Sequence, residues 1–535
     1  MSDDRSNEMS IRSPGEPHRR SIRRSRALAG TVFTRLFGIG AVCCLLAVSA
    51  PAAVSAAAGA SPVPVRLASS HHHGPGKPGW PPGYQWPGPW GPGSLGTATV
   101  GAAPVGTGPS EMAFDPATHT VYVTNGNNDN GPNAGGDTVS VIDTRHCRAQ
   151  DLSLCHGPWP TITVGSLPSS IAVDEATGTV YVTNWGDGTV SVFNGATCNA
   201  INTSGCGQQP ATVPVGLGPI GIYVDDANHT VYVASNGSGS SGSVSVINAD
   251  TCNARYQGGC TGLQTLTVPG GNADVLAVDV ATGTLYVGTE TATGPDLVSV
   301  FNASTCNAIY TGGCGQVPGS IAFGNSGGAP GDSEPNIAVD QVTNTIYATD
   351  TYDFSTPTWT SPGLYMINGA TCDAAHTGCG QAPVLMPLGL SSTTATGPGT
   401  LPWGVAVDET TDTVYVTLFS NGDYAADVAV VNGASCNGYV TNGCNQVATQ
   451  VPVGHNAIGI TLDPFTHDVY TANYQDASAS VIDGAVCNGS VTSGCDRAAG
   501  KLPAAHGPAS IVADPAVGTL YVAGLYALSV LPLAP

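Results

Sequence analysis

The sequence predicts an all-β protein, a β-propeller of eight four-stranded blades, with seven blades as the alternative. Three observations lead to this class. A strand-rich unit recurs eight times, seven of the units carry a pair of cysteines, and the two ends of the repeat region complement each other. Four-stranded units at a period of roughly 40 to 60 residues are typical of propellers.

Every repeat contains an Asp seven positions before a Tyr. The first two copies read AFDPATHTVYVTN and AVDEATGTVYVTN, and the Asps recur every 51 to 68 residues. Within the second unit the segments SIAVD, TVYVTN, TVSVFN and ATVPVG are rich in β-branched residues and are separated by Gly, Asn and Asp. This pattern predicts four short strands. We interpret the Asp as a turn residue and the Tyr as packed between sheets, so neither is assigned a catalytic role. The eight Asps are Asp115, Asp174, Asp225, Asp279, Asp340, Asp408, Asp463 and Asp514.

The phrase VYVTN occurs verbatim at residues 121–125 and 180–184. From Thr97 to the C-terminus the repeat resembles the YVTN family of secreted and surface-layer propellers. The resemblance implies the fold and says little about function, because that family is mostly known as repeat scaffolds.

The two ends of the repeat region predict how the ring closes. The eighth unit contains SIVAD, TLYVAG and ALSVLPL and then stops at Pro535, without a fourth strand. TATVGAAPVG precedes the first unit and reads as a strand without a blade. We therefore expect Thr97 to Val100 to form the outer strand of the last blade, which would leave no open edge there.

The cysteines beyond the N-terminal segment fall in seven pairs, each between the third and fourth strands of its unit. A secreted chain meets an oxidising compartment, so we predict seven local disulfides. Clustered metal binding is disfavoured because no C-x-x-C pair occurs. The predicted bridges are Cys147–Cys155, Cys198–Cys206, Cys252–Cys260, Cys306–Cys314, Cys372–Cys379, Cys436–Cys444 and Cys487–Cys495.

The N-terminus predicts export. HRRSIRRSR, LFGIGAVCCLLAVSA and PAAVSAAAGA follow the charged, apolar and small-residue order of a secretory signal. We expect cleavage between Ala56 and Ala60 rather than a membrane anchor, since the apolar run is short for a span. The predicted parts are a leader over 1–60, a Pro/Gly/His/Trp-rich linker over 61–96 and the propeller over 97–535. His71, His72 and His73 fit a solvated tract better than a metal site. We expect a secreted protein, extracellular or associated with the cell wall, with no membrane span after cleavage.

Charge disfavours one class of partner. The chain has a formal net charge of −22, and nine of its 15 Lys and Arg residues lie in the first 70 residues. The remainder is therefore strongly acidic and repels phosphate backbones, so we expect no nucleic acid partner.

Propeller geometry sorts the loops onto two faces. The cysteine face carries the Asp turns between first and second strands and the cysteine loops between third and fourth strands. The variable face carries the connections between blades and the turns between second and third strands. Loops differ most on the variable face, which we therefore take as the candidate binding face. Its candidate ligand-binding residues are His455, His506, Asp332, Glu111, Asp274, Glu334, Trp185, Tyr352, Trp359 and Trp403.

The chemistry of these candidates is sparse. Neighbouring imidazoles at His455 and His506 would suit a metal or acid–base work, although unliganded surface histidines are commoner. The carboxylates would suit a cation in the channel or be solvated. We predict no dedicated metal site and no cofactor, with a channel-bound cation as the alternative. The favoured function is a non-enzymatic binding or cell-surface module for a protein, glycan or small molecule. The alternative is a secreted hydrolase or lyase, since some propellers of similar fold are lactonases.

Overall fold

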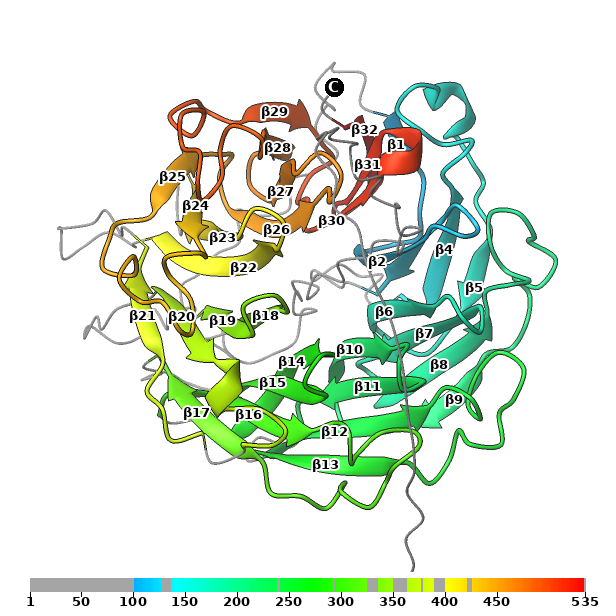
Figure 1. The fold of residues 1–535 in the computed structure, drawn as a ribbon. Helices are drawn as coiled ribbons and strands as arrows, with labels where there is room; N and C mark the ends of the chain where they lie inside the picture. The colour runs from blue at the N-terminus through cyan, green and yellow to red at the C-terminus, as the bar shows by residue number, and fades with distance from the viewer. Residues whose placement is uncertain are drawn as a thin grey trace, which may run out of the picture. The chain divides into compact units, whose positions relative to one another are not determined.

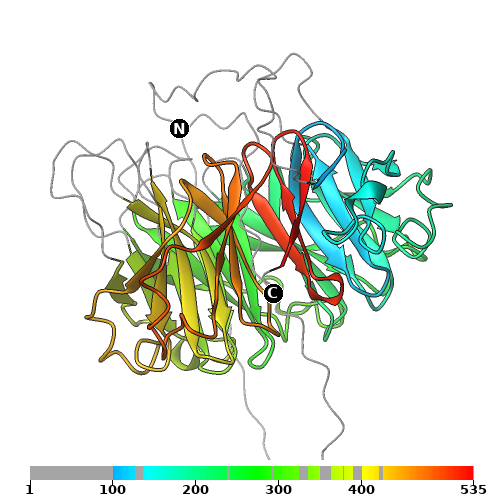
Figure 2. The same cartoon turned by 90° about the horizontal axis from the view of Figure 1, so that it is seen from above.

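The computed structural model describes residues 101–126, 136–237, 241–291, 294–324, 335–349, 363–376, 379–388, 400–420 and 426–533. The predicted leader and linker lie outside these ranges. The described residues form eight antiparallel sheets of four strands each, so the prediction of eight blades is confirmed and the alternative of seven is wrong. Figure 1 shows the blades arranged in chain order around a ring, and Figure 2 shows strands running between its two faces.

Each of the first seven blades is a four-stranded meander, numbered from the centre outward. Blade 1 is β2 (Pro109–Asp115), β3 (Thr120–Asn125), β4 (Thr138–Asp143) and β5 (Thr161–Thr163). Blade 2 is β6 (Pro168–Asp174), β7 (Thr179–Asn184), β8 (Thr189–Asn194) and β9 (Ala211–Pro214). Blade 3 is β10 (Pro219–Asp225), β11 (Thr230–Ser235), β12 (Ser241–Asn248) and β13 (Gln264–Pro269). Blade 4 is β14 (Gly271–Asp279), β15 (Thr284–Thr291), β16 (Asp296–Asn302) and β17 (Gly319–Phe323).

The second half continues the pattern. Blade 5 is β18 (Asn336–Asp340), β19 (Thr345–Thr349), β20 (Gly363–Asn368) and β21 (Val384–Pro387). Blade 6 is β22 (Thr400–Asp408), β23 (Thr413–Ser420), β24 (Asp427–Asn432) and β25 (Thr449–Pro452). Blade 7 is β26 (Ala457–Leu462), β27 (Val469–Asn473), β28 (Ser478–Ile482) and β29 (Gly500–Pro503). The described loops include the 3₁₀ turns η1 (Leu152–Leu154), η2 (Gly369–Thr371) and η3 (Pro515–Val517).

Blade 8 combines both ends of the repeat region. It contains β30 (Ser510–Asp514), β31 (Thr519–Ala523) and β32 (Leu528–Pro532), and β1 (Gly101–Ala103) pairs antiparallel with β32. The predicted outer strand, Thr97 to Val100, lies outside the described residues, and the strand found in that position begins at Gly101. Blue β2 of blade 1 lies beside red β30 of blade 8 in Figure 1.

The core is divided among the junctions between blades. Alternating strand residues place Val, Ile, Leu and Tyr on both sheet surfaces, and each of eight apolar clusters joins two neighbouring blades. The cluster between blades 7 and 8 has seven buried members and no cysteine, whereas the other seven clusters each include a cysteine pair. No helix in the described part of the chain is long and apolar enough to cross a membrane.

Candidate functional site

At seven of the eight junctions, the repeated Tyr joins one blade to the next through a cysteine carbonyl. The Tyr286 hydroxyl donates to the carbonyl oxygen of Cys372 at 2.9 Å, and Tyr122 donates to that of Cys198 at 2.8 Å. All eight tyrosines are fully buried, and burial raises the pKa of the phenols well above its ordinary value, so they stay neutral donors. The other pairs of this kind are Tyr181–Cys252, Tyr232–Cys306, Tyr347–Cys436, Tyr415–Cys487 and Tyr521–Cys147.

The Thr two residues before the Tyr supplies a second bond across the same junction. The Thr120 hydroxyl accepts the backbone N–H of Ala200, two residues beyond Cys198, and Thr284 accepts that of Ala374 in the same way. Seven junctions have this bond, and they are the seven that have the tyrosine bond. In blades 1 to 7, the cysteine loop is thus the part that hydrogen-bonds to the Tyr and Thr hydroxyls of the preceding blade.

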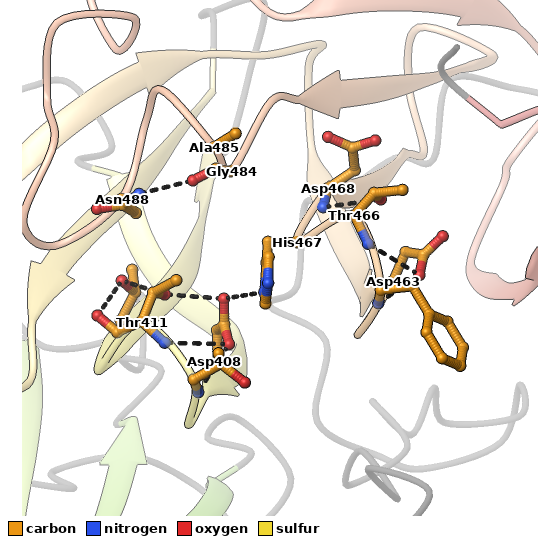
Figure 3. Close-up of polar contacts among 12 residues, drawn as sticks. Asp408, Thr411, Asp463, Thr466, His467, Asp468, Gly484, Ala485 and Asn488 are labelled. Atoms are coloured by element: carbon orange, nitrogen blue, oxygen red, sulfur yellow. Dashed lines mark hydrogen bonds and ion pairs between the residues drawn. The ribbon is translucent and has the colours of Figure 1, made fainter. Parts of the chain in front are cut away.

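The repeated Asp is a turn residue, as predicted. Figure 3 shows Asp408, whose carboxylate accepts the Thr411 hydroxyl at 2.8 Å and the backbone N–H groups of the turn. The fourth residue after the Asp has positive φ, which explains why Gly, Asn, Asp or His occupies it. His467 holds this position in blade 7, and its Nδ1 lies 2.9 Å from the Asp408 carboxylate of blade 6.

The junction between blades 7 and 8 departs from this arrangement. Blade 8 has no cysteine loop, because its fourth strand is β1. At the Thr position of blade 7 the chain has Asp468, and the Tyr470 hydroxyl donates to its carboxylate at 3.5 Å. The repeated Thr is therefore replaced, by Asp468, in the one blade whose following blade has no cysteine loop to bond with.

We expect Tyr286→Phe to destabilise the protein by roughly 1–2 kcal/mol, because it leaves the buried Cys372 carbonyl without its donor. Tyr470→Phe is the matched control, since its described bond is a long one to Asp468 within the same blade, and it is expected to cost less than about 0.5 kcal/mol. Urea unfolding followed by tryptophan fluorescence compares the two variants. Equal losses in the two would refute the role given to the cysteine carbonyl.

On the variable face, His455 is held by a carboxylate. Its Nδ1 lies 2.5 Å from Asp476 Oδ1, and the Lys501 ammonium donates to Asp476 Oδ2 at 2.9 Å. Partial burial acts to raise the pKa of Asp476, but hydrogen bonds from Lys501 and His455 outweigh it and lower the pKa to about 2. The carboxylate is therefore ionised at neutral pH and orients the imidazole, which is about one-third exposed.

His455 and His506 do not form the predicted pair in any described contact. His506 is exposed and its carbonyl accepts the backbone N–H of Leu525. Asp476 lies in the turn between the second and third strands of blade 7, so a neighbouring turn rather than a second histidine supplies the partner of His455. That the two histidines act together on a metal or as acid and base stays a hypothesis.

Glu111 is the clearest of the predicted channel residues. It is buried on β2 of blade 1, and the Ser510 hydroxyl of blade 8 donates to its Oε2 at 3.2 Å, while its Oε1 has no partner among the described residues. Burial raises the pKa of Glu111 to about 8, against the lowering effect of the Ser510 bond, so this carboxyl is mainly protonated at neutral pH. A protonated carboxyl is a poor cation ligand. Asp274 is also buried, on β14, and Asp332 and Glu334 lie outside the described residues.

The predicted aromatic residues have mixed positions. Trp403 lies within β22 rather than on an exposed loop, with its ring 5.4 Å from that of Phe419. Trp185, in the turn after β7, is partly buried beside Gly218 of the next blade. Both therefore contribute to packing between elements. Tyr352 and Trp359 lie outside the described residues.

Sequence reasoning missed a cluster in the first cysteine loop. The Asp143 carboxylate binds Arg145 at 2.8 Å and His146 at 2.7 Å, and Arg145 also donates to the Ala200 carbonyl of blade 2. A groove of about 330 Å³ lies beside it, between the first two cysteine loops, with Trp159 as its aromatic wall. The signal was present, because the first cysteine is followed by Arg148 in this loop and by Asn or Asp in the other six.

Within the part of the chain that the structure describes, no group of three or more His, Cys, Asp or Glu residues could hold a metal ion. The seven predicted disulfides are all formed, so that prediction is confirmed. Their cysteines are buried.

Comparisons with known proteins support the fold alone. No protein-family model matches the chain, and none of the curated proteins matches it. Among solved structures, Saccharomyces cerevisiae Sqt1 is similar with a TM-score of 0.50 and 11% identity, over 81% of this chain and 98% of Sqt1. Kuenenia stuttgartiensis hydrazine synthase has a TM-score of 0.46 and 16% identity, over 73% and 99%. The WD40 β-propeller domain of Doa1 has a TM-score of 0.38 and 12% identity, over 67% and 90%.

Proposed function

We propose that this protein is a secreted propeller of the YVTN type that acts as a binding module, with its ligand at the variable face. The proposal rests on the observation that the repeated residues have structural roles, whereas residues found in single blades do not share those roles. In the repeats, Asp, Thr, Tyr and Cys are committed to turns and to bonds between blades. Residues that occur in single blades remain for recognition, and His455 with Asp476 is the best-defined set of them.

The location outside the cell rests on two supports. Seven disulfides fit an oxidising compartment. The N-terminal segment has the order of a secretory signal. We propose that the mature chain is extracellular, released or associated with the cell wall.

The test is a binding screen of the secreted protein on a glycan array and on purified cell-wall material. We expect the double variant His455→Ala/His506→Ala to lose at least about tenfold in affinity for whatever the wild type binds. The same loss is expected for Tyr352→Ala/Trp359→Ala. A variant in which the loop from 199 to 205 is rewritten between its cysteines serves as the control and should bind normally. Binding lost only in that control would overturn the assignment to the variable face.

One contact favours the alternative of a hydrolase or lyase. A histidine oriented by an ionised carboxylate supplies two of the three members of a nucleophile–base–carboxylate triad, and His455 with Asp476 has that geometry. Assay of lactone hydrolysis by the wild type and by Asp476→Asn tests this function. Turnover that falls at least about 100-fold in the variant would support the enzyme, whereas a wild type without turnover would leave binding as the function.

A further inference from the structure

The tips of the cysteine loops carry exposed apolar side chains. Five of the loops place an isoleucine, tyrosine or valine three or four residues after the first cysteine, with 41% to 64% of its surface exposed. The seven tip residues are Ile201, Tyr256, Ile309, Tyr310, Tyr439, Val440 and Val491. Val342 and Phe465, on Asp turns of the same face, are exposed as well. A soluble protein rarely repeats such exposure around one face without a use for it.

The loops hold these tips rigidly. In loop 4 the Asn307 side chain accepts the backbone N–H groups of Ile309 and Tyr310 at 2.8 Å each, and its amide donates to the Ala303 carbonyl. The disulfide Cys306–Cys314 closes the loop. The same asparagine cap recurs in loops 2, 3, 6 and 7. Because the tips are already ordered, a partner that covers them incurs little conformational entropy cost.

The exposed area is of the size that a protein interface needs. An exposed tyrosine of this kind offers roughly 100 Å², and an aliphatic side chain somewhat less. The seven tips together therefore offer about 500–700 Å², close to the roughly 800 Å² that each partner buries in a standard interface. Neither a small ligand nor a single peptide strand would cover loops 2 to 7 at once.

The repeat itself indicates which partner fits. The tips recur at the spacing of the blades, so a partner that covers several of them must offer receptors at a matching angular spacing. A second copy of the ring has that spacing. A groove that could receive such a tip lies between loops 1 and 2. That groove is lined by Leu154, Pro158 and Trp159, which are suitable contacts for a tyrosine or isoleucine.

We propose that the cysteine face is a self-association surface, on which two copies of this chain pack face to face with the loop tips of each lying between the loops of the other. Such a contact is isologous, with the same patch used on both copies. It leaves the variable face of each copy open, so it is compatible with ligand binding there.

Charge gives the contact an unusual dependence on salt. The propeller carries 33 acidic residues after position 100 against five basic ones, so two copies repel each other. Salt screens that repulsion, with a Debye length that falls from about 30 Å at 0.01 M to about 8 Å at 0.15 M. The apolar contact itself is not weakened by moderate salt. Association should therefore strengthen as ionic strength rises, opposite to binding that is driven by charge.

The experiment is sedimentation velocity on the purified secreted protein across a series of concentrations and salt. We expect a monomer–dimer equilibrium whose dissociation constant falls as salt increases. The variant Ile309→Ser/Tyr310→Ser/Tyr439→Ser/Val440→Ser should weaken it at least about tenfold. Its melting temperature should stay unchanged, because the asparagine caps and disulfides are retained.

A matched control comes from the opposite face. Leu217 and Tyr526 are 65% and 72% exposed on the variable face. The control Leu217→Ser/Tyr526→Ser therefore matches the two-site tip variant Ile309→Ser/Tyr310→Ser in the number and kind of exposed side chains removed, and it should leave association unchanged where that tip variant weakens it. The proposal is overturned if the wild type stays monomeric throughout, or if the control variant weakens the dimer as much as the tip variant does. It is equally overturned if the monomer instead binds vesicles of phosphatidylcholine through the same tips, which would make a membrane the partner.

Discussion

Reducing all seven disulfides is expected to lower the melting temperature of the propeller by about 10 °C or more. Each bridge closes a loop of seven or eight residues, for which the restriction of the unfolded chain contributes about 2 kcal/mol. Seven bridges in separate blades together contribute more than about 10 kcal/mol. For a chain of this size, 1 kcal/mol corresponds to about 1 °C.

Reduction also acts beyond the loops themselves. The carbonyl of the first cysteine in each pair accepts the tyrosine of the preceding blade, as Cys372 does from Tyr286. A loop that loosens after reduction therefore weakens the junction that it completes. We expect the reduced protein to lose cooperativity as well as stability, because blades that grip one another less tightly unfold more independently.

Calorimetry of the protein refolded with and without a reductant measures the effect. The single-pair variant Cys372→Ala/Cys379→Ala is the control and should lose about 2 kcal/mol. Alkylation of the secreted protein, unfolded without reductant, should label no cysteine. A melting temperature that is insensitive to reduction, or labelled thiols in the unreduced protein, would contradict this account.

The sequence was sufficient for the parts of the fold that depend on local pattern. The segments predicted as strands in the second unit correspond to β6, β7, β8 and β9 within a few residues. The cysteine pairs were recoverable because partners lie seven or eight positions apart in one repeated phrase. The Asp turn was recoverable because an Asp that caps its own turn acts within three residues.

The contacts between blades could not be predicted in the same way. The hydroxyl of Tyr122 and its acceptor at Cys198 are 76 positions apart, and periodicity shows only that both recur. His455 was paired with His506 by residue type, whereas the structure pairs it with Asp476, which a neighbouring turn brings close. Pairing across turns depends on the register of strands, which a single repeat does not specify.

The exposure of the side chains at the tips of the cysteine loops could not be predicted from the sequence. Their near-identical phrases suggested a purely structural element, and the asparagine and cysteines are indeed structural. The residues between them are a different matter. The positions of Ile309 and Tyr310 hold different residue types in other loops, and apolar residues at these positions are exposed. The sequence pattern alone does not show which side chains are exposed.

Deleting residues 97–105 is expected to lower the melting temperature by about 5 °C, whereas deleting residues 70–93 should change it by less than about 1 °C. The first deletion removes β1, which pairs with β32 from Gly101↔Val530 to Ala103↔Leu528. It also removes Ala103, which is fully buried in the cluster between blades 8 and 1, and Val105, which packs against that cluster. Lost backbone bonds at about 1 kcal/mol each and the lost apolar burial sum to roughly 5 kcal/mol.

The loss of β1 affects more than the strand itself, because β1 forms the outer edge of the blade that closes the ring. Without β1 the edge of β32 is exposed, and an open edge is a template for pairing with other chains. Blade 8 also lacks a cysteine loop, and the described bond of the Tyr470 hydroxyl, to Asp468, lies within blade 7. The apolar cluster between these two blades is also the smallest of the eight. Losing β1 weakens the last blade on its other side too, so we expect opening of the ring to begin there.

Hydrogen exchange followed by mass spectrometry should show β30, β31 and β32 exchanging faster than β10, β11 and β12 in the 97–105 deletion. The 70–93 deletion is the matched control and should exchange like the full-length protein. Uniform exchange across all blades, or equal melting temperatures for the two deletions, would mean that β1 does not hold the ring closed.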